Sequence, residues 1–302
     1  MGLIDQFVVK TLPFVPRAVV ARISKPYIAG DHLAAAVECV QALNLKGFRA
    51  TIDILGEFVT NFDQAVESQK GYLEVLDAIH ENGLDSNISV KPTSFGLLLD
   101  REKAEKLLDG IMQKVNSHQN FMRLDMEDSP CTTMTIQLYE KFRQEYPGRV
   151  GVVLQSYLRR TVGDIKQITE KGVPTNFRLC KGIYVEPEKI AFKEYQAVRD
   201  NYVRSLEAML KAGAFVGIAT HDDYLVDQAE KMIQKMGLSP DKYEFQMLLG
   251  VRERLRDQIK ERGHNVRIYV PFGKDWYGYS IRRLKENPAL AGTVFKAMFI
   301  KN

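Results

Sequence analysis

The chain has 302 residues, of which 45% are hydrophobic and 26% are charged, and its formal net charge is +4. This composition is typical of a globular protein with a sizeable buried core. Lysine and arginine form no basic run interleaved with aromatic residues, so nucleic acid is not an expected partner. The three cysteines, Cys39, Cys131 and Cys180, are far apart, which argues against a disulfide scaffold or zinc ribbon and favours a reducing compartment.

The first part of the chain, residues 1–45, is predicted to form an N-terminal helical segment, with Asp31 as the cap of an amphipathic helix. Its residues 3–23 are amphipathic, which leaves two interpretations: packing under the rest of the fold, or peripheral contact with lipid. No apolar run approaches the ~20 residues that a membrane span requires. Any association with a membrane is therefore expected to be peripheral.

Eight short apolar runs follow, and nearly every one ends at or beside a charged or polar residue. Each run begins roughly 23 to 40 residues after the last, which leaves room for a strand, a crossover helix and two loops. The pattern predicts a TIM-like (β/α)8 barrel over residues 46–302, with polar groups gathered at its active-site face. The runs cover residues 48–55, 88–90, 121–124, 150–154, 177–179, 215–219, 243–247 and 266–270.

Amphipathic segments between the runs predict the crossover helices, over residues 63–82, 100–117, 132–146, 162–171, 187–212, 224–236 and 252–262. The tail differs from these segments. Residues 276–286 predict a helix on which Tyr279, Arg282, Arg283 and Glu286 share one side instead of an apolar stripe. We therefore expect this helix to cover the barrel mouth as a lid, and residues 289–299 to complete the outer ring.

The adjacent Arg282 and Arg283 are the strongest indication of a ligand-binding site, because the planar guanidinium of arginine binds a carboxylate through paired N–H groups. Lys91 directly follows one apolar run and would project into the mouth, where a lysine can bind a carboxylate, form a Schiff base or hold an acid. Asp125 ends the next run. We expect Asp125 to pair with Lys91 from the neighbouring strand and to place negative charge beside a cationic substrate.

A metal site is not expected, because the five histidines show no ligand spacing. Glu127 and Asp128, which follow Asp125, fit helix capping better than metal binding. Similarly, no GxGxxG or GxxxxGK motif follows a strand, so any dinucleotide must bind at the barrel mouth itself.

Several other run ends carry groups suited to an anionic or heterocyclic ligand. Arg178, Lys181 and Tyr184 combine positive charge with an aromatic ring, and Gly182 between them lets the backbone approach a ligand closely. Three further run ends carry an amide, an imidazole and a phenol, namely Gln155, His221 and Tyr269.

Six motifs together resemble those of the proline dehydrogenases, flavin enzymes that oxidise L-proline to Δ1-pyrroline-5-carboxylate. They are RLD at 123–125, FRLCKGIY at 177–184, ATHD at 219–222, YEFQML at 243–248, RIYVPFG at 267–273 and YSIRRLKEN at 279–287. Five lie at predicted strand exits and one on the tail helix, so the set is far more specific than any single motif. The resemblance covers roughly residues 46–290 and implies the monofunctional bacterial type.

The resemblance implies FAD as the cofactor, L-proline as the substrate and hydride transfer from C5 of the proline ring. Asp125 and Arg178 would be catalytic, with Arg178 near flavin N5. The substrate would be bound by Lys91, Asp125, Tyr184, Leu248, Tyr269, Tyr279, Arg282 and Arg283. The flavin would be bound by Met126, Gln155, Arg178, Lys181, Gly182, Ile183, Thr220 and His221.

Electrons are expected to pass on to a quinone, which suggests a cytoplasmic protein with peripheral contact at the inner face of the cytoplasmic membrane. Two other functions remain open. One is a lyase or aldolase barrel in which Lys91 forms a Schiff base, and the other is a non-enzymatic barrel that binds an amino acid.

Overall fold

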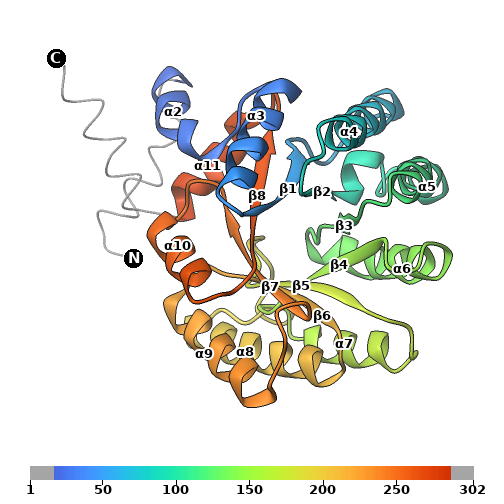
Figure 1. Cartoon of the computed structure of the whole chain (residues 1–302). Coiled ribbons are helices and arrows are strands. Elements are labelled where there is room, and N and C mark those ends of the chain that lie inside the picture. Colours follow the sequence, from blue (N-terminus) through green and yellow to red (C-terminus); the bar gives the residue numbers. More distant parts are fainter. Residues whose placement is uncertain (1–16, 287–302) are drawn as a thin grey trace.

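A computed structural model describes residues 17–286, which fold around a closed barrel of eight parallel strands in chain order (Figure 1). β1 pairs with both β2 and β8, so the sheet closes and has no open edge. Every predicted run overlaps a strand, and the (β/α)8 barrel is confirmed. The strands are β1 (Arg49–Ile54), β2 (Ser86–Val90), β3 (Met122–Leu124), β4 (Val150–Gln155), β5 (Asn176–Cys180), β6 (Phe215–Ala219), β7 (Tyr243–Leu248) and β8 (Val266–Phe272).

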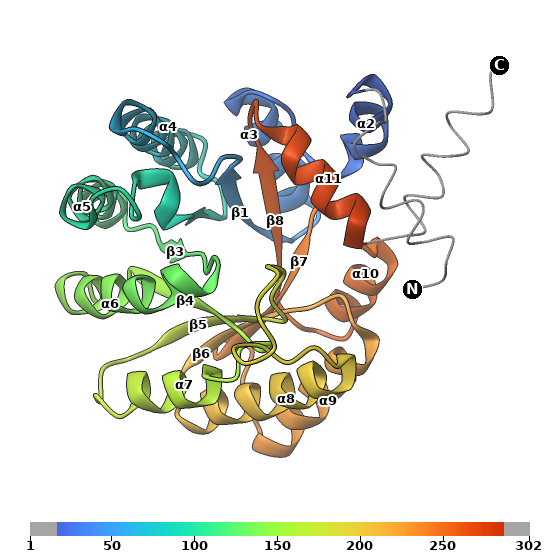
Figure 2. The same ribbon diagram turned by 180° about the vertical axis from the view of Figure 1, so that it is seen from behind.

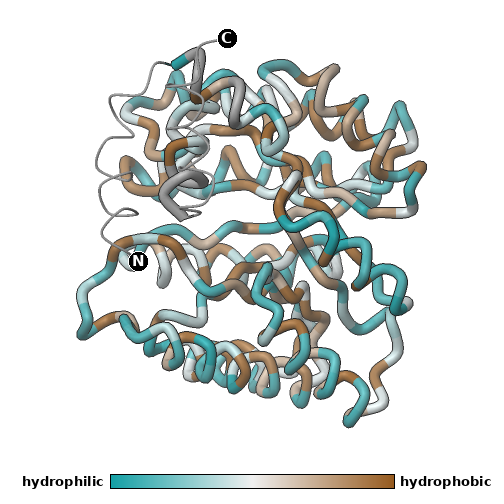
Figure 3. The backbone as a smooth tube through the Cα atoms, turned by 90° about the vertical axis from the view of Figure 1, so that its left-hand side faces the viewer, coloured by the Kyte–Doolittle hydropathy of each residue, from teal (hydrophilic) through white to brown (hydrophobic). Residues whose placement is uncertain are grey.

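A helix follows each of the first seven strands and covers the barrel from outside. These helices are α4 (Phe62–Glu81), α5 (Arg101–Ser117), α6 (Ser129–Glu145), α7 (Thr161–Thr169), α8 (Tyr195–Lys211), α9 (Asp223–Met236) and α10 (Glu253–Glu261). A short 3-10 helix, η3 (Pro92–Phe95), precedes α5. The outer coils alternate between hydrophobic and hydrophilic segments in Figure 3, as amphipathic helices on a core do. Within residues 17–286, no helix is both long and apolar enough to cross a membrane.

Three helix starts differ from the sequence prediction. The helix predicted from residue 132 begins at Ser129. The cap of α3 (Leu33–Leu45) is His32 and not Asp31, because Nδ1 of His32 accepts a hydrogen bond from the Ala35 amide at 3.2 Å. The helix expected from residue 187 begins only at Tyr195. Backbone hydrogen bonds of the segment before α8 explain the delay: the Phe192 amide donates to the Tyr157 carbonyl at 2.8 Å, and the Ile190 carbonyl accepts from the Arg159 amide at 3.0 Å. These bonds hold residues 190–192 in a bridge with the loop after β4. Just before this segment, the Glu186 carboxylate accepts hydrogen bonds from the amide and hydroxyl of Ser129 at 2.6 and 2.7 Å.

The wall outside β8 and β1 is formed by α3, which precedes the barrel in sequence and buries Ala36, Val40 and Leu43. The predicted helix over 289–299 lies outside the described residues. Before α3 come α2 (Arg17–Ser24) and the short η2 (Lys25–Tyr27).

The tail helix α11 (Trp276–Glu286) has the predicted bounds and lies beside α2 (Figure 2). The guanidinium of Arg17 lies 5.8 Å and 4.9 Å from the ring centroids of Trp276 and Tyr277, which holds the two helices together. Tyr279 of α11 is buried and lines the cavity at the barrel mouth. The helix therefore covers part of the mouth, as predicted for a lid.

The interior of the barrel is polar, whereas TIM barrels are more often filled by branched aliphatic side chains. Strand alternation turns residues such as Ile88 and Val90 outward to the helices and sends polar residues inward. The Thr51 hydroxyl donates to Asn87, Arg123 donates to both the backbone and side-chain oxygens of Asn176, and Arg267 pairs with Glu244. The active-site face therefore rests on a hydrogen-bonded floor.

Candidate active site

A cavity of about 780 Å³ opens at the carboxyl ends of the strands, a size typical of small-molecule sites. The predicted site residues with described side chains all line it: Lys91, Asp125, Met126, Gln155, Arg178, Lys181, Gly182, Ile183, Tyr184, Thr220, His221, Leu248, Tyr269 and Tyr279. The side chains of Arg282 and Arg283 lie outside the described residues. Both belong to α11, the helix whose Tyr279 lines this cavity.

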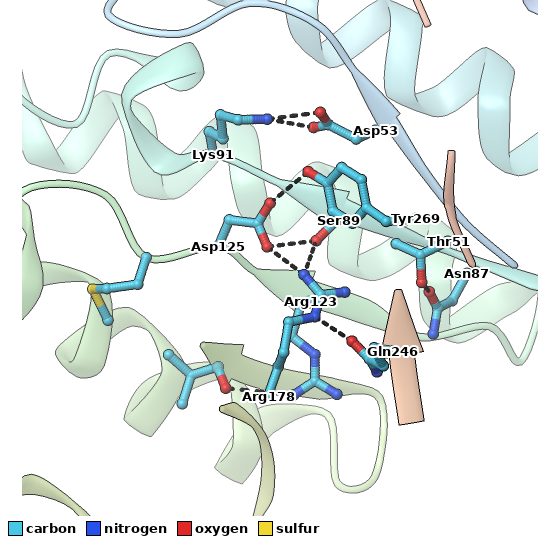
Figure 4. Close-up of polar contacts among 12 residues, drawn as sticks. Thr51, Asp53, Asn87, Ser89, Lys91, Arg123, Asp125, Arg178, Gln246 and Tyr269 are labelled. Atoms are coloured by element: carbon cyan, nitrogen blue, oxygen red, sulfur yellow. Dashed lines mark hydrogen bonds and ion pairs between the residues drawn. The ribbon is translucent and has the colours of Figure 1, made fainter. Parts of the chain in front are cut away.

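Asp125 is the centre of the hydrogen bonding at the cavity floor (Figure 4). Its Oδ1 accepts from the Ser89 hydroxyl at 2.6 Å and from Nη1 of Arg178 at 2.7 Å. Its Oδ2 accepts from the Tyr269 hydroxyl at 2.8 Å. Because Asp125 and Arg178 are both largely buried, solvent screens their attraction little. Residues from three strands, β2, β5 and β8, thus hold the carboxylate in one orientation.

The partner of Lys91 differs from the one predicted. Nζ of Lys91 donates to both carboxylate oxygens of Asp53, at 2.6 and 2.8 Å, and not to Asp125 (Figure 4). Asp53 is fully buried on β1 and also contacts the Tyr72 hydroxyl at 3.2 Å. Burial by itself lowers the pKa of Lys91, but attraction to Asp53 and Asp125 outweighs it and raises the pKa. Sequence reasoning missed Asp53 because it is a single acid inside an apolar run; its inward register was the available signal.

Gly182 lines the cavity at the exit of β5 and packs closely against Tyr157. Its φ of +104° is one that side chains rarely adopt, and an added Cβ would overlap the ring of Tyr157. Nearby, Nε2 of Gln155 donates to the Met126 carbonyl at 3.1 Å. Oε1 of Gln155 is buried and, among the described residues, has no hydrogen-bond partner. The cavity therefore presents an acceptor suited to an N–H group of a heterocycle.

Next to Gly182, a cationic cluster surrounds Asp222. The carboxylate of Asp222 accepts from Lys181 at 2.5 Å, from Arg199 at 2.7 and 2.9 Å, and from the Tyr195 hydroxyl at 2.8 Å. Burial raises the pKa of Asp222, but these hydrogen bonds outweigh it and lower the pKa well below its usual range. Arg199 and Tyr195 were not predicted, because they come from α8 and no strand-end pattern marks them.

The rim of the cavity connects loops that follow different strands. The Tyr184 hydroxyl lies 3.4 Å from Oε2 of Glu57, which joins the loop after β5 to the loop after β1. His221 links the next two strand exits, because its Nε2 accepts from the Leu248 amide at 2.9 Å. Both contacts hold residues that the sequence placed at the site.

Glu127 connects three more loops and is not the helix cap that was expected. Its carboxylate accepts from the amide of Thr93 at 3.0 Å and from the Thr93 hydroxyl, and the same hydroxyl oxygen accepts from the Phe58 amide at 3.0 Å. Asp128 occupies the N-cap position of α6 but makes no capping hydrogen bond with its side chain. Burial raises the pKa of Glu127 to about 7. The loops after β1, β2 and β3 are thereby tied together beside Lys91.

The chemistry of the cavity fits FAD. The unpartnered Gln155 oxygen suits the edge of an isoalloxazine, and the cationic side chains of Lys181 and Arg199 beside Gly182 suit phosphate groups. Among residues 17–286, no cluster of His, Cys, Asp or Glu is arranged to hold a metal ion. The fold and the cavity together define a TIM barrel with a small-molecule site at its mouth, whose lining fits a flavin.

Comparisons with known proteins identify the family. The profile described as "Proline dehydrogenase" matches residues 36–296. Proline dehydrogenase 2 of Bacillus subtilis is 36% identical over 90% of this chain and 88% of its own length, and proline dehydrogenase of Deinococcus radiodurans is 33% identical over 91% and 90%. The chain belongs to the proline dehydrogenase family.

A solved structure agrees on the fold. Proline utilization A from Bdellovibrio bacteriovorus superposes with a TM-score of 0.83 at 22% identity, over 90% of this chain. The matched region is 34% of that chain, so this protein spans about a third of its length.

The first prediction concerns Gly182. In Gly182→Ala, backbone strain of about 1–3 kcal/mol and overlap with Tyr157 should weaken FAD binding by roughly 10- to 100-fold. Flavin titration monitored by fluorescence quenching measures this affinity. The matched control is Gly172→Ala, which has a φ of +67° but open space around its Cβ. Equal FAD affinity in Gly182→Ala and the wild type would contradict the role given to this glycine.

The second prediction concerns the Asp53–Lys91 pair. In Asp53→Asn, burial of Lys91 is no longer opposed by this carboxylate, so the Lys91 pKa should fall. A lysine with a lower pKa loses its charge as pH rises, so the KM for proline should begin to increase at a lower pH than in the wild type. Asp227→Asn is the control, because it removes the carboxylate from an exposed lysine pair with Lys231. Superimposable pH profiles for Asp53→Asn and the wild type would exclude the coupling.

Proposed function

We propose that the protein oxidises L-proline to Δ1-pyrroline-5-carboxylate with FAD, the first step of proline catabolism, through the residues gathered in this cavity. The observation that carries the assignment of residues is their convergence: fourteen positions from seven strand exits and the tail helix line one cavity. Membership of the family supports the reaction.

The substrate is a zwitterion with a small apolar ring, and the cavity offers a complement to each part. Lys91, with Arg282 and Arg283 of α11, is proposed to bind the carboxylate. Asp125 is proposed to lie beside the ring nitrogen. Tyr184, Leu248, Tyr269 and Tyr279 are proposed to form the wall around the ring. Charges of opposite sign at the two ends of this binding site would fix the orientation of the substrate. Correct orientation accounts for a large part of the rate enhancement.

Asp125 has a second proposed task. The ring nitrogen of free proline is protonated, and hydride cannot leave easily from the carbon beside an ammonium, so the proton must depart first or together with the hydride. Asp125, or a water beside it, is proposed to receive that proton. FAD, when bound, supplies the two-electron acceptor for the hydride. Arg178 is proposed to stabilise the negative charge that develops next to it.

The geometry opposes the Schiff-base alternative. A lysine nucleophile needs a lowered pKa, whereas Nζ of Lys91 donates to both oxygens of Asp53 and its pKa is raised. Lys91 is therefore better suited to bind a carboxylate than to attack a carbonyl.

The third prediction tests the reaction. The purified protein should be yellow, and L-proline added under argon should bleach its flavin absorbance. Asp125→Ala should keep its FAD and bleach at least about tenfold more slowly, because it loses the acid beside the nitrogen. A yellow protein that binds proline without bleaching would be an amino-acid sensor, and a colourless one would support the aldolase alternative.

The electron acceptor is proposed to be a quinone, in a cytoplasmic protein that contacts the membrane peripherally. Two exposed apolar residues in the loop after β5 support a hydrophobic acceptor. Ile183 lines the cavity and is 40% exposed, and Val185 in the same loop is 98% exposed. Apolar side chains left in water beside a redox cavity provide a surface on which an apolar molecule gains by burial.

The fourth prediction follows from Val185. In Val185→Asp, turnover with a short-chain quinone should fall several-fold, while anaerobic bleaching by proline should match the wild type. Stopped-flow absorbance separates the two half-reactions. The control is Val162→Asp, at an exposed valine on α7 that lies outside the loop after β5. Equal quinone turnover in Val185→Asp and the wild type would remove this loop from the acceptor site.

A further inference from the structure

The guanidinium of Arg178 is held from two sides. On one side, Nη1 donates to Asp125 at 2.7 Å and to the Ser89 hydroxyl at 3.0 Å. On the other side, Nε donates to the side-chain oxygen of Gln246 on β7 (Figure 4). Among the described residues, no hydrogen bond engages Nη2. This N–H group is therefore the donor left for a ligand in the cavity.

The orientation of the Gln246 amide is dictated by its second partner. Nε2 of Gln246 donates to Oε1 of Glu244 at 2.7 Å. Burial raises the pKa of Glu244, but the ion pair with Arg267 outweighs it and lowers the pKa, so Glu244 stays an anion that can only accept. The amide nitrogen must face Glu244, and the amide oxygen must therefore face Arg178.

Glu244 is itself anchored at the floor of the barrel. Nε of Arg267 donates to it at 2.6 Å, and Nη1 of Arg49 lies 3.4 Å from its other oxygen. Arg267 also donates to the Ala50 carbonyl at 2.6 Å. A continuous series of hydrogen bonds thus runs from β1 and β8 through Glu244 and Gln246 to Arg178.

The neighbouring strand leaves space for this side chain. A Cβ added at Gly217 on β6 would overlap the amide of Gln246. The residue at position 246 is also neutral, whereas a carboxylate there would form a second ion pair with Arg178. Gln246 gives Arg178 an acceptor while adding no negative charge beside it.

We propose that Gln246 is the positioning residue for Arg178: its amide oxygen orients the guanidinium so that Nη2 faces the flavin, and its neutrality preserves the positive charge there. The inference rests on the proposed function, in which Arg178 acts beside FAD. A role through Arg178 predicts an effect on the redox properties of the bound flavin, which simple packing would not produce.

The test compares three FAD-bound variants with the wild type. Gln246→Met keeps the length of the side chain and removes the acceptor, and Gln246→Glu keeps the acceptor and adds a carboxylate. Thr51→Val is the matched control, because it removes another hydrogen bond inside the same barrel, to Asn87, without contact to Arg178. The midpoint potential of the flavin is measured by dye-coupled chemical reduction, which needs no proline, together with kcat, KM and the melting temperature.

We expect Gln246→Met to lower kcat about tenfold with little change in KM, and to lower the equilibrium constant for flavin reduction roughly tenfold, or about 30 mV for a two-electron couple. Gln246→Glu should lower the potential further as pH rises and the new carboxyl ionises. Thr51→Val should lower only the melting temperature. A flavin midpoint potential equal to that of the wild type, in either Gln246 variant with FAD bound, would overturn the proposal. The potential is measured without proline, so the two proposals are tested separately. If proline is not the substrate, the flavin absorbance will not bleach when proline is added, whatever the potential is.

Discussion

The buried ion pair between Asp125 and Arg178 is the interaction on which the geometry of the cavity depends. An isolated charge in the interior of a protein is costly, and removal of one member of a buried pair leaves the other uncompensated. Here the remaining lone pairs and N–H groups are engaged by Ser89, Tyr269 and Gln246. The pair and its partners therefore hold residues of β2, β5, β7 and β8 and the residue that follows β3 in a fixed relation. The pair also places the acid that is proposed to lie beside the substrate nitrogen directly against the arginine that is proposed to act beside the flavin.

The sequence predicted the fold well because its signals are local. Short apolar runs that end in polar residues mark the strands of a parallel barrel whatever their partners are, and the tail helix was bounded by Asn287-Pro288. The late start of α8 was not predictable in this way, because residues 190–192 form backbone hydrogen bonds with residues 157–159 of the loop after β4, which are distant in the sequence. The helix pattern continues through residues that a distant contact holds in a loop.

Site positions were also predictable from strand ends, but their partners were not. Asp125 and Lys91 come from adjacent strands, which made their pairing the natural expectation. In the structure, a residue from a third strand is the partner of Lys91. The side chain of Asp53 on β1 points inward and pairs with Lys91, whereas Asp125 pairs with Arg178. Arg199 and Tyr195 lie on a helix, where charged and aromatic residues are common on solvated faces. The partner of each site residue can be assigned only from the closed barrel, because side chains from all eight strands point into the same interior.

The tie between Glu127, Thr93 and Phe58 has a consequence for how a large ligand enters. It joins the loops after the first three strands to one another, and the Tyr184–Glu57 contact adds the loop after β5 to the same group. A large ligand therefore meets a connected set of loops along this part of the rim. Displacement of any one of these loops during cofactor loading is coupled through these hydrogen bonds to the others.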